Sequence, residues 1–319
     1  MKTFIINLDK DTYKKIIIED LCKKHALDYE FITAIYGFQL KDDYIHSITN
    51  KQESITKIRR ELSKGEIGCT LSHLQIFNKI INNNLEYALI LEDDAYFDEK
   101  LLFFLNNFNG FLEDWDCILL GYYIGKDDLH YKIKFMDEIK SGNFIYRKSL
   151  DLLHGTHGYI VSKKGAEKLL KYNSKITLPI DSYTGNPKLI NQFCVYPPII
   201  NVNKQLDINT ELEKDRKRLR EIYQITQNLI DKIDYFDKNC KIIIYGYGTI
   251  GQLLCEQIKN KKEIHCIIDS SYNLEELIEK HEDILFINTI LTQSESIKIT
   301  KKLQELFKNA QIISIYEEF

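Results

Sequence analysis

The sequence predicts an α/β fold, and three observations carry this prediction. Short apolar runs typical of buried strands occur at residues 3–8, 29–34, 87–91 and 115–121. Segments around 11–25, 64–83 and 98–109, which we predict as helices, lie between these runs. The chain has 319 residues, 44% of them hydrophobic and 28% charged, a composition typical of globular proteins with a sizeable core. Alternation of strands and helices predicts a mostly parallel sheet covered on both faces.

Two α/β units joined by a helix are predicted. The first spans residues 1–208 and includes a polar loop through residue 57 and a glycine-flanked turn at 155–158. A helical linker follows over residues 209–238, where Thr210 and Glu213 fit a capping box. Residues 239–319 form the second unit, a small Rossmann-like module with strands at 241–245, 264–268, 284–287 and 311–315.

Composition also excludes several classes of protein. The formal net charge of −4 gives no nucleic-acid footprint, and no apolar run has the length of a membrane span. The seven cysteines contain no C-x-x-C pair, which argues against a disulfide framework and for reduced thiols. Because the first residues indicate a strand rather than a signal peptide, we expect a soluble, cytoplasmic protein.

Three consecutive carboxylates, Glu92, Asp93 and Asp94, directly follow the buried strand at 87–91. Burying anions at a sheet edge is costly unless a cation or hydrogen-bond donors meet them. Mn²⁺ or Mg²⁺ carrying a diphosphate would meet them, and ligands of open α/β sheets collect at the carboxyl ends of strands. The pattern predicts a nucleotide–metal site. The alternative is a solvated acidic loop that caps the next helix.

The helix predicted from about residue 64 has an unusual face. Ser63 and Glu66 match a capping box at its start. At 100° per residue, one face carries only small side chains: Gly65, Gly68, Cys69 and Ser72. Two interpretations stay open. The face packs tightly against the sheet, or a nucleotide lies against it, with Ser72 and His73 within reach.

Together, these residues resemble the signature of glycosyltransferase family 25, the lipooligosaccharide-biosynthesis family that includes collagen galactosyltransferases. The segments that carry the resemblance are residues 63–73 (SKGEIGCTLSH) and 87–94 (YALILEDD). Further matches follow in the family's order, and the resemblance covers roughly residues 1–205. These matches are Ile5, Asn7 and Leu8, Ala34 with Gly37, residues 114–116, residues 155–162, Gly165–Ala166, Leu169–Leu170 and residues 179–181.

The resemblance implies a GT-A-type, Rossmann-like domain that uses a UDP-sugar donor and Mn²⁺ or Mg²⁺ and inverts the anomeric carbon. The implied reaction transfers a hexose, galactose before glucose, to a saccharide acceptor of lipooligosaccharide, lipopolysaccharide or capsule. Its partners would be the UDP-sugar and a glycolipid or oligosaccharide acceptor, with no nucleic acid.

Carried over by position, Asp94 and Glu92 are the implied metal ligands, and Asp93 touches ribose or the donor sugar. The third metal ligand stays open among Asn203, Gln205, Asp207 and water. The resemblance and the small helix face together give the donor-binding set: Asn7, Leu8, Ala34, Glu66, Ser72, His73 and Asp93.

An inverting transfer needs a base that deprotonates the acceptor hydroxyl. Asp181, which matches the family's proline–aspartate position, is the implied base, and a helix N-cap is its alternative role. The acceptor or donor sugar is expected to lie against the turn that contains His154, Gly155, Thr156 and His157.

The second unit carries its own motif, Gly246-x-Gly248-x-x-Gly251, between a predicted strand and a predicted helix. Asp269 ends the next strand, near the position expected to hold ribose hydroxyls. The motif leaves two interpretations open, a nucleotide-binding turn and a structural or homo-oligomerising module.

Two other functions therefore stay open beside the transferase: an NAD-dependent oxidoreductase or epimerase built on this module, and a non-catalytic nucleotide-sugar-binding protein. The basic run at residues 214–218 indicates a solvated helix face. Its alternative is a peripheral contact with anionic lipid on the cytoplasmic face of the inner membrane.

Overall fold

The computed structural model describes residues 1–108, 114–123, 134–141, 143–203, 205–206, 211–235, 241–246, 248–258, 262–268, 284–308 and 310–316. The chain divides into two compact units, Met1–Arg216 and Lys217–Phe319. The division falls within helix α8 (Glu211–Asp234), the segment predicted as a linker. Each unit has its own sheet and its own hydrophobic core.

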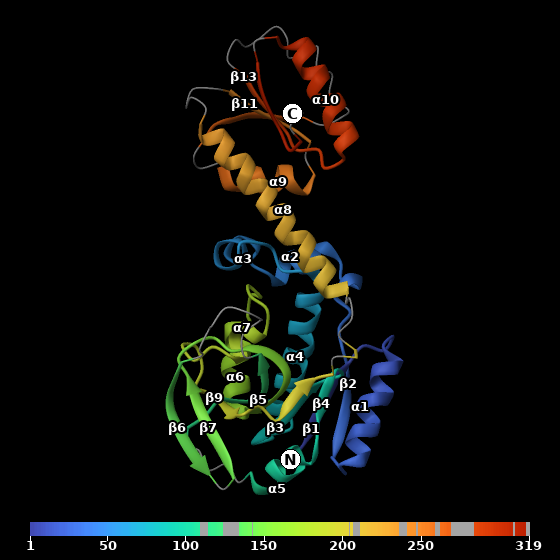
Figure 1. Ribbon diagram of the computed structural model, residues 1–319, viewed down its shortest axis with the longest axis vertical. Coiled ribbons are helices and arrows are strands. Elements are labelled where there is room, and N and C mark those ends of the chain that lie inside the picture. Colours follow the sequence, from blue (N-terminus) through green and yellow to red (C-terminus); the bar gives the residue numbers. More distant parts are fainter. Residues whose placement is uncertain are drawn as a thin grey trace. The chain divides into compact units, whose positions relative to one another are not determined.

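Strands and helices alternate in part of the first unit, as predicted, whereas α2, α3 and α4 follow one another, and so do β6, β7 and β8 (Figure 1). Its elements are β1 (Thr3–Asn7), α1 (Thr12–Lys24), β2 (Tyr29–Thr33), η1 (Gly37–Gln39), α2 (Asp42–Ile48), α3 (Lys51–Ile58), α4 (Lys64–Asn82), β3 (Tyr87–Glu92), β4 (Ala95–Phe97), α5 (Glu99–Asn107), β5 (Cys117–Tyr123), β6 (Phe135–Ser141), β7 (Phe144–Ser149), β8 (His154–Ser162), α6 (Lys163–Tyr172), α7 (Asp181–Thr184), β9 (Gln192–Tyr196) and β10 (Ile200–Val202).

The central sheet is mixed, so the prediction of a mostly parallel sheet was wrong. Eight strands lie in the order β2-β1-β3-β8-β5-β9-β7-β6. β1 pairs in parallel with β2 and β3, and β5 pairs in parallel with β9. β8 lies antiparallel between β3 and β5, and β7 is antiparallel to β6 and β9. Hydrophobic runs mark a strand as buried on both faces but do not encode its direction.

Both faces of this sheet are covered by helices, as predicted. Alternate residues along a strand point to opposite faces. Phe4, Ala88 and Ile90 therefore pack in one core cluster with Phe77 of α4 and Leu169 of α6. Their neighbours in sequence pack in a second cluster, with α1 and α5: Ile5, Leu89 and Leu91, with Ile18, Cys22, Leu101 and Phe104.

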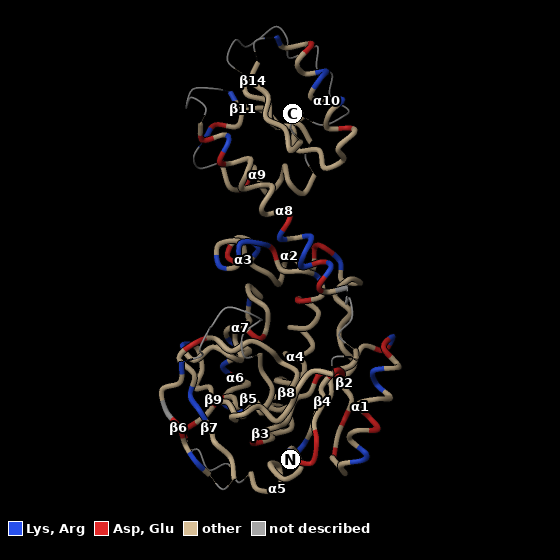
Figure 2. The backbone as a smooth tube through the Cα atoms, in the orientation of Figure 1, with Lys and Arg blue, Asp and Glu red and all other residues tan. Residues whose placement is uncertain are grey.

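Charge is distributed to match this burial. Lys, Arg, Asp and Glu gather on the helices α1, α2 and α3, whereas β5, β8 and β9 carry none (Figure 2). β3 carries a single charged residue, Glu92, at its carboxyl end. Glu92 is therefore a charged side chain at the end of a buried strand, whereas the charges on α1, α2 and α3 lie on helices at the surface.

The segment predicted as a polar loop through residue 57 forms the two short helices α2 and α3. Asn50 caps α3, because its side-chain oxygen accepts a hydrogen bond from the Glu53 amide at 3.1 Å. Ile48 and Ile58 pack against a small cluster formed by Leu62, Ile67 and Ile176. The apolar residues are few and widely spaced, so the periodic signal in the sequence is weak although the cap is present.

The predicted capping box at the start of α4 is confirmed. The Ser63 hydroxyl accepts from the Glu66 amide at 3.1 Å, and the Glu66 carboxylate accepts from the Ser63 amide at 2.9 Å. Gly68 lies against the backbone of the segment after β2: a Cβ there would lie 2.4 Å from the Ile35 carbonyl oxygen and 2.6 Å from the Gly37 nitrogen. At this position the small face of α4 serves tight packing.

We therefore expect Gly68→Ala to lower the free energy of unfolding by about 1–3 kcal/mol, because the added methyl overpacks a contact with backbone. The better helix propensity of alanine, about 1 kcal/mol, offsets only part of this loss. Chemical denaturation measures the difference. Gly248→Ala is the control, since a Cβ there meets no atom within 4 Å. A Gly68→Ala chain as stable as the wild type would contradict this close packing.

The second unit is a small parallel α/β module, as the sequence predicted. Its four strands lie in the order β12-β11-β13-β14, and their described pairings are all parallel. The helix α10 was not predicted. After α8 the elements are β11 (Lys241–Tyr245), α9 (Thr249–Ile258), β12 (Ile264–Ile268), β13 (Ile284–Asn288), α10 (Gln293–Leu306) and β14 (Gln311–Ser314).

Candidate active site

A cavity of about 480 Å³ opens in the first unit at the carboxyl ends of β1, β2 and β3. Carboxyl ends of adjacent parallel strands meet at one edge of a sheet, which is where ligands of α/β proteins bind. Eight residues predicted to bind donor or metal line this cavity: Asn7, Leu8, Ala34, Ser72, His73, Glu92, Asp93 and Asp94. Side chains from distant parts of the sequence thus converge on one hollow.

Glu92 lies at the tip of β3 and is held by two protein groups. One of its oxygens accepts a hydrogen bond from the Thr156 hydroxyl and lies 3.3 Å from His73 Nε2. Burial alone would raise the pKa of Glu92, but the bonds from His73 and Thr156 outweigh it and lower the pKa to about 2. Glu92 is therefore an anion engaged with the cavity wall, and its predicted role as a metal ligand competes with these bonds.

Asp93 is held from the side of α1 and β1. Asn7 Nδ2 donates to its carboxylate at 2.8 Å, and Lys14 Nζ lies 3.4 Å away. Burial would lower the pKa of Lys14, but the charges of Asp93 and Asp94 outweigh burial and raise it. Burial raises the pKa of Asp93. Lys14 and Asn7 act in the opposite direction but offset burial only in part, so the pKa of Asp93 stays above its ordinary value.

Asp94 is the second residue of the turn between β3 and β4 and lines the cavity. Its carbonyl oxygen accepts from the Asn203 amide at 2.7 Å, which brings Asn203, one of the residues left open as a third metal ligand, next to the acidic tip. Asn203 Oδ1 accepts from the Gln205 amide at 3.1 Å. Asp207 lies outside the described residues.

Glu66, predicted to bind the donor, is not among the residues that line the cavity. Its side chain is only 1% exposed, and Arg60 binds both carboxylate oxygens at 2.7 and 2.8 Å. Arg216 of α8 adds a third contact through Nε at 2.8 Å. With the Ser63 amide also bound, Glu66 holds α4, Arg60 and the start of α8 together. These contacts give Glu66 a structural position, and its predicted contact with the donor stays a prediction.

Glu66→Gln should lower the free energy of unfolding by about 2–3 kcal/mol, since two guanidinium groups lose their anion; the partial exposure of Arg216 reduces the full cost. Burial would raise the pKa of Glu66, but Arg60 and Arg216 outweigh it and lower the pKa. The stabilisation is thus complete above the ordinary carboxyl pKa and is lost as the pH falls through the lowered one.

Denaturation curves of the wild type and Glu66→Gln measured at several pH values should therefore converge in acid. Glu53→Gln, which removes an exposed pair with Lys57 on α3, should change stability by no more than about 0.5 kcal/mol. A constant gap between wild type and Glu66→Gln down to low pH would contradict the assignment.

Residues 155–158 lie within strand β8, so the predicted turn was wrong. Gly158 pairs with Leu91 on one side and with Gly121 on the other. A Cβ at Gly158 would lie 2.5 Å from Ile200 Cδ1, and one at Gly121 would lie 2.4 Å from the His157 ring. Glycine is needed at these positions because neighbouring groups pack closely against the strand. From the sequence alone, a glycine required by close packing cannot be told from a glycine required by a turn.

The four predicted sugar-lining residues therefore take different positions along one strand. Thr156 bonds Glu92, and His157 is buried, so that burial lowers its pKa. Gly155 adopts a φ of +110° beside the His157 ring, a backbone conformation that favours glycine. His154 is mostly exposed, with 58% of its side chain accessible. None of the four is among the residues that line the cavity.

Asp181 and His154 lie together, and neither is among the residues that line the cavity. His154 Nδ1 lies 3.3 Å from Asp181 Oδ2, and this hydrogen bond raises the pKa of His154. Asp181 also acts electrostatically on Cys69, which lines the cavity, and on Arg216. It is the first residue of α7, whose N-cap is Ile180, so the alternative role of Asp181 as N-cap is not what the structure has.

Several cavity residues were not predicted. Lys10 and Lys14 bring two cations to the hollow, and Lys10 Nζ lies 4.0 Å from the centroid of the Tyr36 ring, which also lines it. Phe38 and Leu212 add apolar surface. The available signal was a pair of lysines four residues apart, directly after the strand that ends in Asn7 and Leu8.

The glycines of the second unit form a close turn between β11 and α9. Gly246 has a φ of +96°, and a Cβ at Gly251 would lie 2.1 Å from the Gly246 carbonyl oxygen. Gly248 has open space around it, and Asp269 lies outside the described residues. Packing thus accounts for Gly246 and Gly251, and whether the turn binds a nucleotide stays a prediction.

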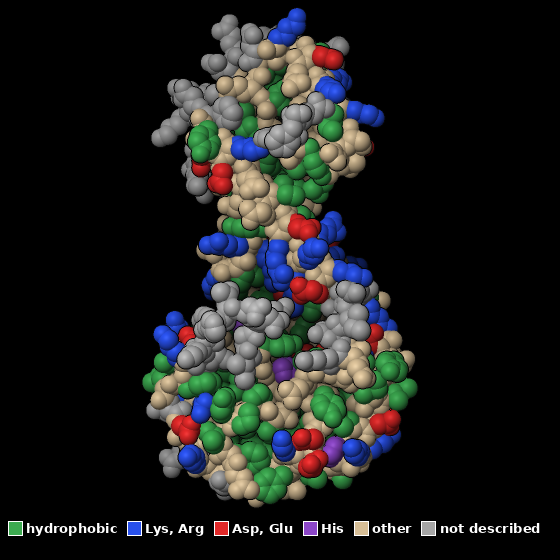
Figure 3. Space-filling model, viewed as in Figure 1, with side chains coloured by type: hydrophobic (Ala, Val, Ile, Leu, Met, Phe, Trp, Pro, Cys, Tyr) green, Lys and Arg blue, Asp and Glu red, His purple; other side chains and the backbone are tan. Residues whose placement is uncertain are grey.

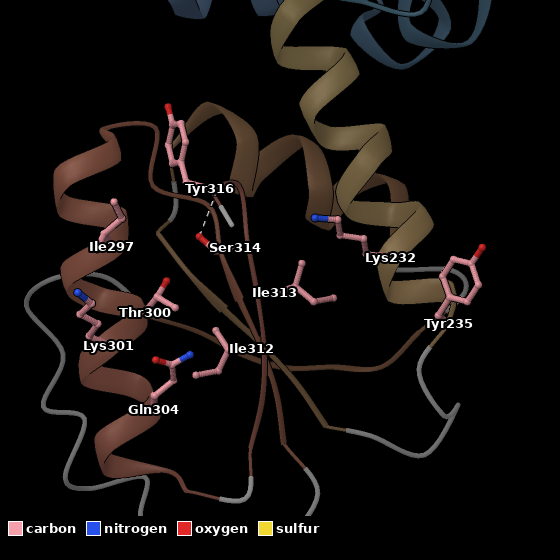
Figure 4. Close-up of a pocket in the computed structure, with 10 residues that line it drawn as sticks. All are labelled: Lys232, Tyr235, Ile297, Thr300, Lys301, Gln304, Ile312, Ile313, Ser314 and Tyr316. Atoms are coloured by element: carbon pink, nitrogen blue, oxygen red, sulfur yellow. Dashed lines mark hydrogen bonds between the residues drawn. The ribbon is translucent and has the colours of Figure 1, made fainter. Parts of the chain in front are cut away.

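A hollow of about 470 Å³ in this unit lies elsewhere. Figure 4 shows it along β14, between the end of α8 and α10, with Lys232 and Tyr235 on one side and Thr300 and Gln304 on the other. The glycine turn does not line it. Among the described residues of the second unit, the turn and this hollow therefore form separate features.

On the face seen in Figure 3, acidic, basic and apolar side chains all occur over the described part of the first unit, and Lys and Arg side chains gather at its upper end. Among the described residues, no helix combines the length and apolar character needed to cross a bilayer. On α8, Lys214, Lys217 and Arg218 are exposed, whereas Arg216 faces Glu66.

Comparison with known proteins adds to this geometry. Residues 1–184 match the model of a family described as glycosyltransferase family 25 (LPS biosynthesis protein). Procollagen galactosyltransferase 1 of Danio rerio is 28% identical over 193 residues, which cover 57% of this chain and 30% of that protein. Lipooligosaccharide biosynthesis protein lex-1 of Haemophilus influenzae is 31% identical over 185 residues, 51% of this chain and 59% of the relative.

The chain thus matches only 30% of the length of the procollagen galactosyltransferase. Among solved structures, a glycosyltransferase involved in the glycosylation of the major capsid of PBCV-1 matches with a TM-score of 0.35 and 10% identity, over 68% of this chain and 97% of that one. This likeness is too low to add to the family match.

Proposed function

The chain belongs to glycosyltransferase family 25, and on this premise we propose that it transfers a hexose, galactose in the first place, from a UDP-sugar to a saccharide acceptor. The names of two relatives, a procollagen galactosyltransferase and a lipooligosaccharide biosynthesis protein, support the class of reaction. The acceptor we propose is a terminal sugar of lipooligosaccharide, lipopolysaccharide or capsule.

One observation carries the proposal: eight predicted donor and metal residues line one cavity at the carboxyl edge of the sheet. Lys10 and Lys14 supply cations suited to a diphosphate, and the ring of Tyr36 supplies a flat apolar surface suited to a base. A volume of about 480 Å³ is in the range of small-molecule sites.

The donor groups at the acidic tip fit a hard divalent cation. Glu92, Asp93 and Asp94 all line the cavity, and carboxylate oxygens suit Mn²⁺ and Mg²⁺. Asp94 lines the cavity in the turn directly after β3 and matches the family's acidic motif by position, so we assign it as the principal ligand. Such a cation, when bound, supplies positive charge against the departing diphosphate.

Asp181 is the base that we propose for an inverting transfer. Its carboxylate would accept the proton of the acceptor hydroxyl as that oxygen attacks the anomeric carbon. His154, 3.3 Å away, holds the carboxylate in place. Lys10 and Lys14 would bind the donor, while Asp93, fixed by Asn7, would orient ribose or sugar hydroxyls.

A lipid-linked acceptor would bring the chain to a membrane surface, and we extend the proposal to a peripheral contact there. Exposed Lys214, Lys217 and Arg218 of α8 offer charges suited to anionic head groups. Co-sedimentation with anionic vesicles at low and high salt tests this extension, and equal recovery with neutral vesicles would contradict it.

The proposed reaction is tested by screening UDP-sugars for slow hydrolysis in Mn²⁺. One nucleotide sugar should release UDP, and a chelator should stop the release. The oxidoreductase alternative predicts instead a change in NAD absorbance with a sugar nucleotide. A chain that hydrolyses no UDP-sugar and binds none of them would overturn the transferase proposal and favour neither alternative.

A further inference from the structure

The wall of the cavity contains a second group of potential metal-ligand atoms, which does not include Asp94. Cys69, His73 and Glu92 each offer one ligand atom, and these atoms all lie within 4.8 Å of one another. Cys69 and His73 are four residues apart on α4 and so share one helix face. Glu92 meets them from the tip of β3, and all three residues line the cavity.

The chemistry of this group differs from that of the carboxylates beside it. One sulfur, one imidazole nitrogen and one carboxylate oxygen form a mixed set that suits Zn²⁺ and Co²⁺. Mn²⁺ and Mg²⁺ prefer sites made of oxygen atoms. The cluster therefore selects a softer metal than the one proposed at Asp94.

Two of the three side chains are oriented from outside by further hydrogen bonds. The Tyr159 hydroxyl lies 2.7 Å from His73 Nδ1, which turns Nε2 toward Glu92. The Thr156 hydroxyl donates to Glu92. His73 and Tyr159 are both fully buried, so the ring is fixed. Metal-binding histidines and carboxylates are held by such outer partners in known sites.

We propose that Cys69, His73 and Glu92 form a three-ligand site for Zn²⁺, with the fourth coordination position open to the cavity. Bonds of about 2.0–2.3 Å place tetrahedral ligand atoms roughly 3.5 Å apart, so the side chains need to close by only about 1 Å. Three protein ligands with an open fourth position are typical of zinc sites that remain accessible to water or a further ligand.

Binding of Zn²⁺ to these three residues requires that His73 and Cys69 give up the protons on their metal-binding atoms. His73 Nε2 now donates its proton to the Glu92 carboxylate, so this proton must leave Nε2 when the metal binds there. The neutral ring then carries its one proton on Nδ1, where the Tyr159 oxygen accepts it. Burial raises the pKa of the Cys69 thiol, so its proton is released to solvent as the metal binds, and the Zn²⁺ charge stabilises the thiolate. The bond between His73 and Glu92 is replaced by two metal bonds.

The site is tested with the tag-free chain of residues 1–319 and CoCl₂, read by absorption spectroscopy. Co²⁺ at a tetrahedral site with a thiolate gives visible bands and a thiolate-to-metal charge-transfer band in the near ultraviolet. We expect both bands to saturate at one Co²⁺ per chain, and Zn²⁺ but not Mn²⁺ to abolish them. The measurement needs no activity, so its failure is distinct from failure of the transferase proposal.

Cys69→Ser should remove the charge-transfer band, and Tyr159→Phe should weaken Co²⁺ affinity by about 10–100-fold. Cys255→Ser, at a partly buried cysteine of the second unit, is the matched control and should keep the band. A wild-type chain without the band, a band that survives in Cys69→Ser, or one that Mn²⁺ abolishes equally well would overturn the proposal.

Discussion

Asp94→Asn should reduce UDP-sugar turnover by at least about a hundredfold, and it should weaken UDP binding in the presence of Mn²⁺. The substitution keeps the size of the side chain and removes the negative charge that we assign to the cation. Asp94 lies on the cavity beside Lys14, whose pKa its charge helps to raise. Calorimetric titration with UDP, with and without Mn²⁺, separates loss of the cation from loss of the nucleotide.

Asp43→Asn is the matched control for this experiment. Asp43 lies exposed in the first turn of α2, outside the cavity, so its replacement should leave both turnover and UDP affinity unchanged. If Asp94→Asn kept near-normal turnover in Mn²⁺, the cation would be held elsewhere at the strand tip, or the reaction would not depend on it.

Much of the fold could be predicted because its signals are local. β1, β3 and β5 are largely buried apolar runs and stand out in the sequence, and the core clusters on the two sides of β1 and β3 explain why. The capping box of Ser63 and Glu66 marked the first residue of α4 correctly. Strand direction and order were out of reach, because pairing partners are set by tertiary contacts.

Site residues could be predicted from the sequence where a motif lies at the end of a strand. They could not be predicted where the role of a side chain depends on which residues surround it in the folded protein. Asn7 and Asp93, 86 positions apart in sequence, meet at 2.8 Å as their strand-end positions suggested. Glu66 carries the same charge as Asp93, yet Arg60 and Arg216 surround it, and Arg216 comes from α8, far along the chain. The sequence does not show which distant residues will pair with a given carboxylate, because the fold decides which side chains meet.

The glycines illustrate the same limit. At Gly65, Gly68 and Gly158 another part of the protein lies too close for a larger side chain, but the neighbouring group differs at each position. It is a leucine side chain at Gly65, backbone at Gly68 and an isoleucine at Gly158. Of the residues on the small face of α4, Gly65, Cys69 and Ser72 line the cavity, whereas Gly68 does not.

Asp181→Asn should lower transfer to the acceptor by about 10²–10⁴-fold and leave UDP affinity unchanged, because a general base acts on the acceptor and not on the nucleotide. The change also preserves size and keeps an oxygen that can accept from His154. Transfer is measured with the donor and acceptor that the screen identifies, and UDP affinity by calorimetry in Mn²⁺.

Asp114→Asn, at an exposed carboxylate paired with Lys164, is the control and should change neither quantity. The pattern expected of Asp181→Asn is opposite to that of Asp94→Asn, in which UDP affinity falls together with turnover. Near-normal transfer by Asp181→Asn would remove Asp181 as the base. Joint loss of UDP affinity and thermal stability would instead make Asp181 a structural residue of α7, since a base that only removes the acceptor proton contributes to neither.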